Sequence, residues 1–94
     1  MDILIYEHFL GEDYKDQLSP LILNEAKLIM EIIIKDLSLE FSDSKISLLL
    51  NKKNRNLIHS NNHIYRNYED DVITDISKKI KENDKVLILA PEEN

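Results

Sequence analysis

Polar and charged side chains directly follow three apolar runs of this 94-residue chain. Carboxylates in such positions can bind an ammonium group or orient a nucleophilic amine, because they offer negative charge and hydrogen-bond acceptors. The alternative interpretation is that they are solvated charges at loop ends in an acidic protein. The residues are Glu7 and His8, Asn51 and Lys52, and Pro91, Glu92, Glu93 and Asn94.

The apolar runs that precede these residues predict the strands of a mostly parallel sheet. Continuous apolar runs of this length are typical of strands that are covered on both faces. Parallel strands end at one edge of a sheet, and ligands gather there. The predicted order is β-α-β-(β)-α-β, with strands near 3–6, 46–50 and 86–90 and helices over 20–37 and 69–83. The piece at 63–66 is either a minor strand or a loop. We therefore expect a Rossmann-like α/β fold with right-handed crossovers and helices on both faces.

The first predicted helix begins at Ser19-Pro20, since serine favours the N-cap and proline the first helical position. Its polar residues form one narrow stripe, in which Glu31 and Lys35 are spaced for an ion pair. The remaining surface is apolar, wider than one sheet covers. Either a second element or a partner must cover the rest, and a homodimer through residues 20–37 is one such arrangement.

The second predicted helix has a single narrow apolar stripe and an exposed face. The stripe consists of Val72, Ile73, Ile76 and Ile80. Acidic residues stand at its start and three lysines, at 78, 79 and 81, at its end, as the helix dipole favours. We interpret these lysines as a solvated end of the helix.

Several kinds of site are excluded by composition. One glycine in the whole chain rules out a glycine-rich dinucleotide turn and a phosphate-binding P-loop. The absence of cysteine rules out thiolate ligands, disulfides and a cysteine nucleophile. His8, His59 and His63 lack a nearby acid pair that would complete a metal site, so we expect no metal.

Charge and hydropathy limit the partners. The net charge of −6 gives no basic surface for nucleic acid or an anionic membrane. With 43% hydrophobic residues and no long apolar run, the chain is expected to form one domain, residues 1–94, that does not span a membrane. It begins without a basic leader and passes directly into a strand, so we expect a cytoplasmic location.

Three blocks of the chain resemble the N-terminal region of archaeal ATP-grasp ligases, in particular those similar to tyramine–L-glutamate ligase of methanofuran biosynthesis. The blocks are Ile3 to Phe9, Leu23 to Met30, and Leu87 to Asn94, in which Ala-Pro-Glu after a strand is the most specific part. The family tends to have glycine where Ala26 stands here.

The resemblance implies a pre-ATP-grasp domain that forms part of a substrate pocket and packs against the remaining ATP-grasp domains of the same chain. Those domains would bind ATP and magnesium and make the acyl phosphate that an amine attacks. The matching positions are Glu7, Ser19, Asn24, Glu25 and Glu92, and they are expected to contact substrate or another domain. None would be catalytic, and residues 1–94 alone, as a fragment of a longer ligase, would be inactive.

Two other functions remain as alternatives. One is a stand-alone α/β binding or dimerisation module without catalytic activity, which the wide apolar surface of the first helix favours. The other is a small complete enzyme that acts through Glu7 and His8.

Overall fold

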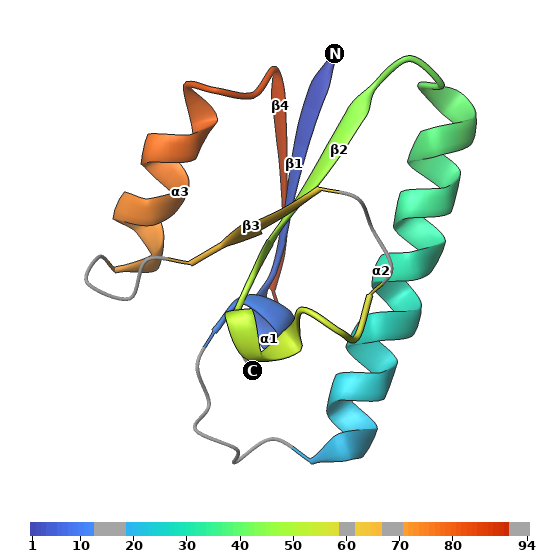
Figure 1. The fold of residues 1–94 in the computed structure, drawn as a ribbon, viewed down its shortest axis with the longest axis vertical. Helices are drawn as coiled ribbons and strands as arrows, with labels where there is room; N and C mark the ends of the chain where they lie inside the picture. Colours follow the sequence, from blue (N-terminus) through green and yellow to red (C-terminus); the bar gives the residue numbers. More distant parts are fainter. Residues whose placement is uncertain (13–18, 59–61, 67–70, 91–94) are drawn as a thin grey trace.

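The computed structural model describes residues 1–12, 19–58, 62–66 and 71–90, and they form a four-stranded sheet with a helix on each face (Figure 1). The elements in chain order are β1 (Asp2–Glu7), α1 (His8–Gly11), α2 (Pro20–Glu40), β2 (Lys45–Leu50), the 3₁₀ helix η1 (Lys52–Asn54), β3 (His63–Tyr65), α3 (Val72–Ile80) and β4 (Lys85–Leu89). This confirms the predicted order and adds α1 and η1.

All strand pairs are parallel, and the strands lie in the order β3-β2-β1-β4. β1 is central, with Ile5 opposite Leu48 of β2 on one side and Leu87 of β4 on the other. The carboxyl ends of the strands therefore meet at one edge, as in other open α/β sheets. The Rossmann-like α/β fold expected from the sequence is confirmed.

Helix α2 covers one face of the sheet. Ser19 is its N-cap and accepts a hydrogen bond from the backbone N–H of Ile22 at 3.3 Å, and Pro20 is its first residue, as predicted. Ala26 and Met30 face the sheet and are buried. They pack in one cluster with the β1, β2 and α1 side chains Ile3, Ile5, Ile46, Leu48, Leu50 and Leu10.

Helix α3 covers the opposite face, where Ile76 packs against Leu4, Tyr6 and Leu49. The predicted apolar stripe is only half correct, because Ile73 and Ile80 are 75% and 47% exposed. Asp75, one position before Ile76, is fully buried instead. Among the described residues, no helix has the length and apolar character needed to cross a membrane.

Strand β4 forms one edge of the sheet. The sequence predicted a buried strand here, and this is wrong for Leu87 and Ile88. Leu87 is 37% exposed and Ile88 is 52% exposed. Their pairing with Ile5 and Tyr6 places them on opposite faces, so both faces of the sheet are incompletely covered at β4.

The short helix α1 directly follows the carboxyl end of β1. Its last residue, Gly11, packs so closely on Tyr6 that a Cβ atom there would lie 2.2 Å from Cε2 of the tyrosine ring. The close packing of β1 and α1 thus depends on the single glycine of the chain.

Candidate functional site

A cavity of about 220 Å³ opens at the carboxyl end of β1 and β4, between α1 and the first half of α2. Its walls are mostly apolar, and two acidic residues are among those that line it. The lining residues are Glu7, Phe9, Ile22, Glu25, Ala26, Ile29, Leu89 and Ala90. The cavity therefore lies at the edge of the sheet where the sequence predicted a site.

Glu7 is the buried carboxylate of this cavity, with an exposed fraction of 6%. Its Oε1 and Oε2 accept hydrogen bonds from the backbone N–H groups of Phe9 at 3.1 Å and Leu10 at 2.9 Å, so Glu7 caps α1. Each carboxylate oxygen can accept more than one hydrogen bond. Within the described residues Glu7 has no ion pair with a lysine, arginine or histidine, so its negative charge is not neutralised by a neighbouring cation.

The other predicted site residues have different positions. Glu25 borders the cavity from the exposed surface of α2. Asn24 is exposed and does not line the cavity, and Ser19 serves as the N-cap of α2. Glu92 lies outside the described residues. The structure thus brings Glu7 and Glu25 to one cavity and leaves Asn24 and Ser19 outside its lining.

Asn51, which the sequence placed on the same edge, has a structural role. It is 5% exposed, its Nδ2 donates to the carbonyl of Glu12 at 3.1 Å, and its backbone N–H donates to the carbonyl of Leu10 at 2.8 Å. Asn54 Nδ2 also donates to the Leu10 carbonyl. These amides fix α1 against the end of β2 and so help to position Glu7.

On the α3 face, a buried ionic network surrounds Arg66, and the sequence did not predict it. Arg66 Nε donates to Asp75 Oδ2 at 2.7 Å, and its Nη1 forms an ion pair with Glu12. Lys79 Nζ contacts Asp75 Oδ1 at 2.6 Å, so this lysine is not part of a solvated helix end. Tyr6 donates its hydroxyl to Glu12 at 2.8 Å. The available signal was the spacing of Asp75 and Lys79 along the inward line of Val72 and Ile76.

The network changes the pKa values of two members. Burial, together with the hydrogen bond to Glu12, raises the pKa of the Tyr6 hydroxyl well above its usual range. Burial alone would lower the pKa of Arg66, but the hydrogen bond to Asp75 and the charge of Glu12 outweigh it and raise the pKa. The network is thus a paired structural cluster in which Arg66 stays charged.

The histidines do not form a metal centre in the described part of the chain, where no three His, Asp or Glu side chains cluster suitably. His8 packs edge-on against Phe9, and His63 packs edge-on against Tyr65. His59 lies outside the described residues.

The arrangement suits a ligand with a positive group and an apolar body. The ammonium group of such a ligand would meet the Glu7 carboxylate, and the apolar walls would cover the rest. Comparison of the chain with protein-family models, with curated proteins and with solved structures finds no match.

Proposed function

We propose that this chain forms the N-terminal, substrate-side domain of an ATP-grasp carboxylate–amine ligase. Such an enzyme makes an amide bond through an acyl phosphate. The observation that carries the proposal is the buried carboxylate of Glu7, which borders an apolar cavity without a cation beside it in the described residues. A buried charge is costly unless it is paired, so an ammonium group is the favoured occupant.

The open side of the sheet supports the same proposal. Leu87 and Ile88 of β4 are uncovered on opposite faces, next to a cavity that also lies beside β4. A further domain that packs along β4 would cover these side chains and close the cavity. The amine would then be held between this domain and the next.

ATP and magnesium belong to other domains in this proposal. The residues of this chain do not fit them: it has one glycine and therefore no phosphate-binding loop, and the described residues offer no cluster for a metal. The role of this domain is to bind and orient the amine, and Glu7 would keep the ammonium group in place.

The coding sequence downstream of Asn94 provides a direct test. We expect it to continue into glycine-rich strands with lysine and glutamate residues that could bind ATP and magnesium. A stop codon directly after Asn94 would contradict the ligase proposal.

Binding of a small aromatic amine tests the role of Glu7. Tyramine, followed by NMR chemical shifts or calorimetry, is expected to perturb residues around the cavity, and Glu7→Gln is expected to weaken this binding by about tenfold or more. Tyrosol, which has a hydroxyl in place of the amine, is the matched control ligand. Glu40→Gln is the matched control variant, since Glu40 is exposed at the far end of α2 and does not line the cavity. Equal binding of tyramine and tyrosol would refute the ammonium site.

A second candidate function is a binding or dimerisation module. The apolar side chains of α2 that point away from the sheet favour it, because contiguous exposed apolar surface marks interaction sites. Dimerisation through α2 is compatible with the ligase proposal, since the exposed apolar residues Leu21, Leu28, Ile32 and Leu39 do not line the cavity.

A further inference from the structure

Helix α2 carries a straight apolar stripe on the side opposite the sheet. Leu21, Leu28, Ile32 and Leu39 are 68%, 57%, 60% and 75% exposed. At about 100° per residue they lie within about 20° of one line along the helix. Met30, which is fully buried against the sheet, lies about 180° from that line.

The four apolar residues of this outer stripe do not line the cavity beside β4, whereas Glu25, which lies between Leu21 and Leu28, borders it. Ile22 and Ile29 line the cavity, and they lie about 80–100° around the helix from the stripe. A domain that covers β4 and the cavity would therefore leave the four stripe residues exposed. A different partner is needed to cover them.

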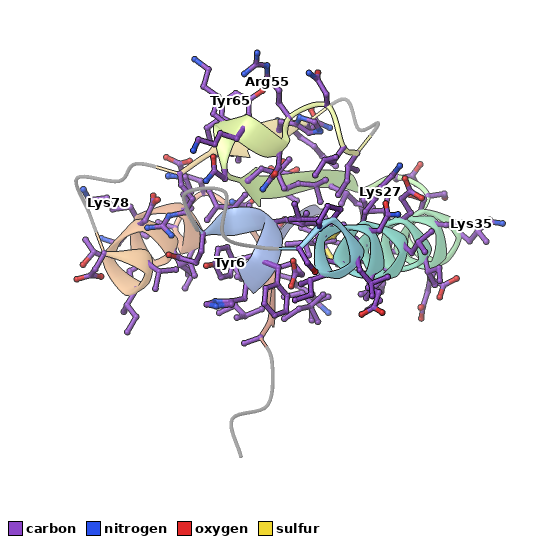
Figure 2. The ribbon with its side chains drawn as sticks, turned by 90° about the horizontal axis from the view of Figure 1, so that it is seen from below. Tyr6, Lys27, Lys35, Arg55, Tyr65 and Lys78 are labelled. Carbon is purple, nitrogen blue, oxygen red and sulfur yellow. The ribbon has the colours of Figure 1, made fainter. Side chains whose placement is uncertain are left out.

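Two charged residues complete the stripe. Glu25 and Lys35 stand between the apolar members, so that the six positions alternate at spacings of four and three residues, as in a coiled-coil seam. Both side chains are exposed, and within the described residues neither forms an ion pair. The predicted pair of Glu31 with Lys35 is not formed, since Glu31 lies 4.0 Å from Lys27 instead. Figure 2 shows Lys35 projecting away from the sheet.

The stripe is symmetric about its centre. Leu28 and Ile32 each lie two residues from Met30, Leu21 and Leu39 each nine, and Glu25 and Lys35 each five. In an antiparallel pair of α2 helices, Leu21 of one copy therefore lies opposite Leu39 of the other, and Leu28 lies opposite Ile32. Glu25 lies opposite Lys35 between them.

We propose that two copies of this chain dimerise through an antiparallel α2–α2 seam about a two-fold axis that passes between Leu28 and Ile32. A parallel pair would bring Glu25 against its own copy and Lys35 against its own copy, so the charges select the antiparallel orientation. The inference rests on the dimerisation candidate above and is independent of any ligase activity.

Charge reversal tests the seam. We expect a sedimentation mass of twice 11.1 kDa for the unaltered protein. Glu25→Lys and Lys35→Glu should each weaken dimerisation by about tenfold, since each puts like charges opposite one another at two places. The double variant Glu25→Lys, Lys35→Glu should restore dimerisation. Glu82→Lys and Lys81→Glu, at exposed positions on the far side of the sheet, are the matched controls and should have no effect.

An apolar-to-charged change tests the contribution of the stripe itself. Leu28→Glu should give a particle of 11.1 kDa, with dimerisation weakened by at least about a hundredfold. Ile73→Glu makes the same kind of change at an exposed position of α3 and should leave the dimer intact. A protein that is monomeric throughout a concentration series, or a dimer that Ile73→Glu disrupts and Leu28→Glu does not, would overturn the proposal.

Engineered cysteines test the orientation, and the natural chain contributes no cysteine of its own. A mixture of Leu21→Cys and Leu39→Cys proteins should form disulfide-linked heterodimers. Leu21→Cys alone should not crosslink, because about 27 Å would separate the two copies of residue 21 in the antiparallel pair, well beyond disulfide reach. Rapid crosslinking of Leu21→Cys alone would show a parallel dimer, and this would refute the seam while leaving dimerisation intact.

Discussion

Tyr6 links β1 to α1 and to the ionic network around Arg66. The residue is 3% exposed, and its hydroxyl donates a hydrogen bond to Glu12. Because burial and Glu12 raise its pKa in the folded protein, the unfolded chain loses the tyrosine proton at a lower pH than the folded one. The stabilisation is thus complete below the usual value of 10.0 and is lost as the pH rises above it.

This difference predicts an alkaline loss of stability that depends on Tyr6. Unfolding by urea at a series of alkaline pH values should show the free energy of unfolding falling above pH 10, and Tyr6→Phe should flatten that fall. At neutral pH the variant should lose about 1 kcal/mol, because it lacks the hydrogen bond to Glu12. Tyr65→Phe, at a 40% exposed tyrosine, is the control and should keep the alkaline dependence. An unchanged alkaline fall in Tyr6→Phe would contradict this cause.

Gly11 gives a second prediction at the residue scale. A methyl group at this position would overlap the buried Tyr6 ring, so Gly11→Ala should lower the free energy of unfolding by about 1–3 kcal/mol. The double variant Tyr6→Leu, Gly11→Ala should lose less than the sum of the two single changes, because the smaller side chain removes the overlap. Strict additivity in this cycle would rule out a clash with Tyr6 as the cause.

The ionic network predicts a large effect from a small change. Asp75 is fully buried and forms ion pairs with Arg66 and Lys79. Asp75→Asn removes the negative charge and would leave the buried Arg66 without this ion pair. Breaking a buried pair in this way should cost about 3–5 kcal/mol in chemical unfolding. Asp43→Asn makes the same substitution at an exposed position and should change stability by less than about 0.5 kcal/mol. Equal effects of the two changes would mean that the network contributes nothing.

At the scale of the elements, α3 depends on its cap. Asp71 Oδ1 accepts a hydrogen bond from the Thr74 backbone N–H at 2.7 Å, and this bond lowers the pKa of Asp71 below its usual 3.8. A depressed pKa stabilises the fold above the unfolded value, and the contribution is lost as the pH falls through the folded value.

Helix α3 should therefore lose stability in acid through Asp71. Asp71→Asn keeps a good N-cap that does not titrate, so this variant should show a weaker acid dependence in thermal unfolding followed by circular dichroism. Asp43→Asn is a comparison at another exposed aspartate. If the thermal stability of Asp71→Asn and of the unaltered protein falls equally in acid, this cap is excluded as a cause.

Elements with strong local signals were predictable from the sequence, whereas tertiary environments were not. Ser19-Pro20 predicted the start of α2 because capping is a local property. The burial of Asp75 and Arg66 was missed because it depends on their ion pair, and this pair joins α3 to a residue outside that helix. The position of Glu7 at the edge of the sheet was predicted from topology. Its role as the N-cap of α1 was not predicted, since α1 has only four residues and no periodic signal.

At the scale of the whole molecule, the sheet is well covered on β1 and β2 and open at β4. An apolar run alone does not distinguish a central strand from an edge strand, which is why Val86 to Leu89 was predicted to be buried. The cavity lies on this open side, and the surface of α2 that points away from the sheet carries the proposed seam. The molecule thus presents two apolar surfaces with separate proposed partners.

The open side of β4 predicts a contrast between two isoleucines on neighbouring strands. Ile5 is fully buried, so Ile5→Ala should lower the free energy of unfolding by about 2–5 kcal/mol in urea. Ile88 is 52% exposed, so Ile88→Ala should cost about 1 kcal/mol or less. In a longer protein whose next domain packs along β4, Ile88→Ala would remove buried contacts and should cost clearly more than in residues 1–94. An equal cost of Ile88→Ala in both would mean that β4 stays uncovered, and the proposed interdomain contact would then be wrong.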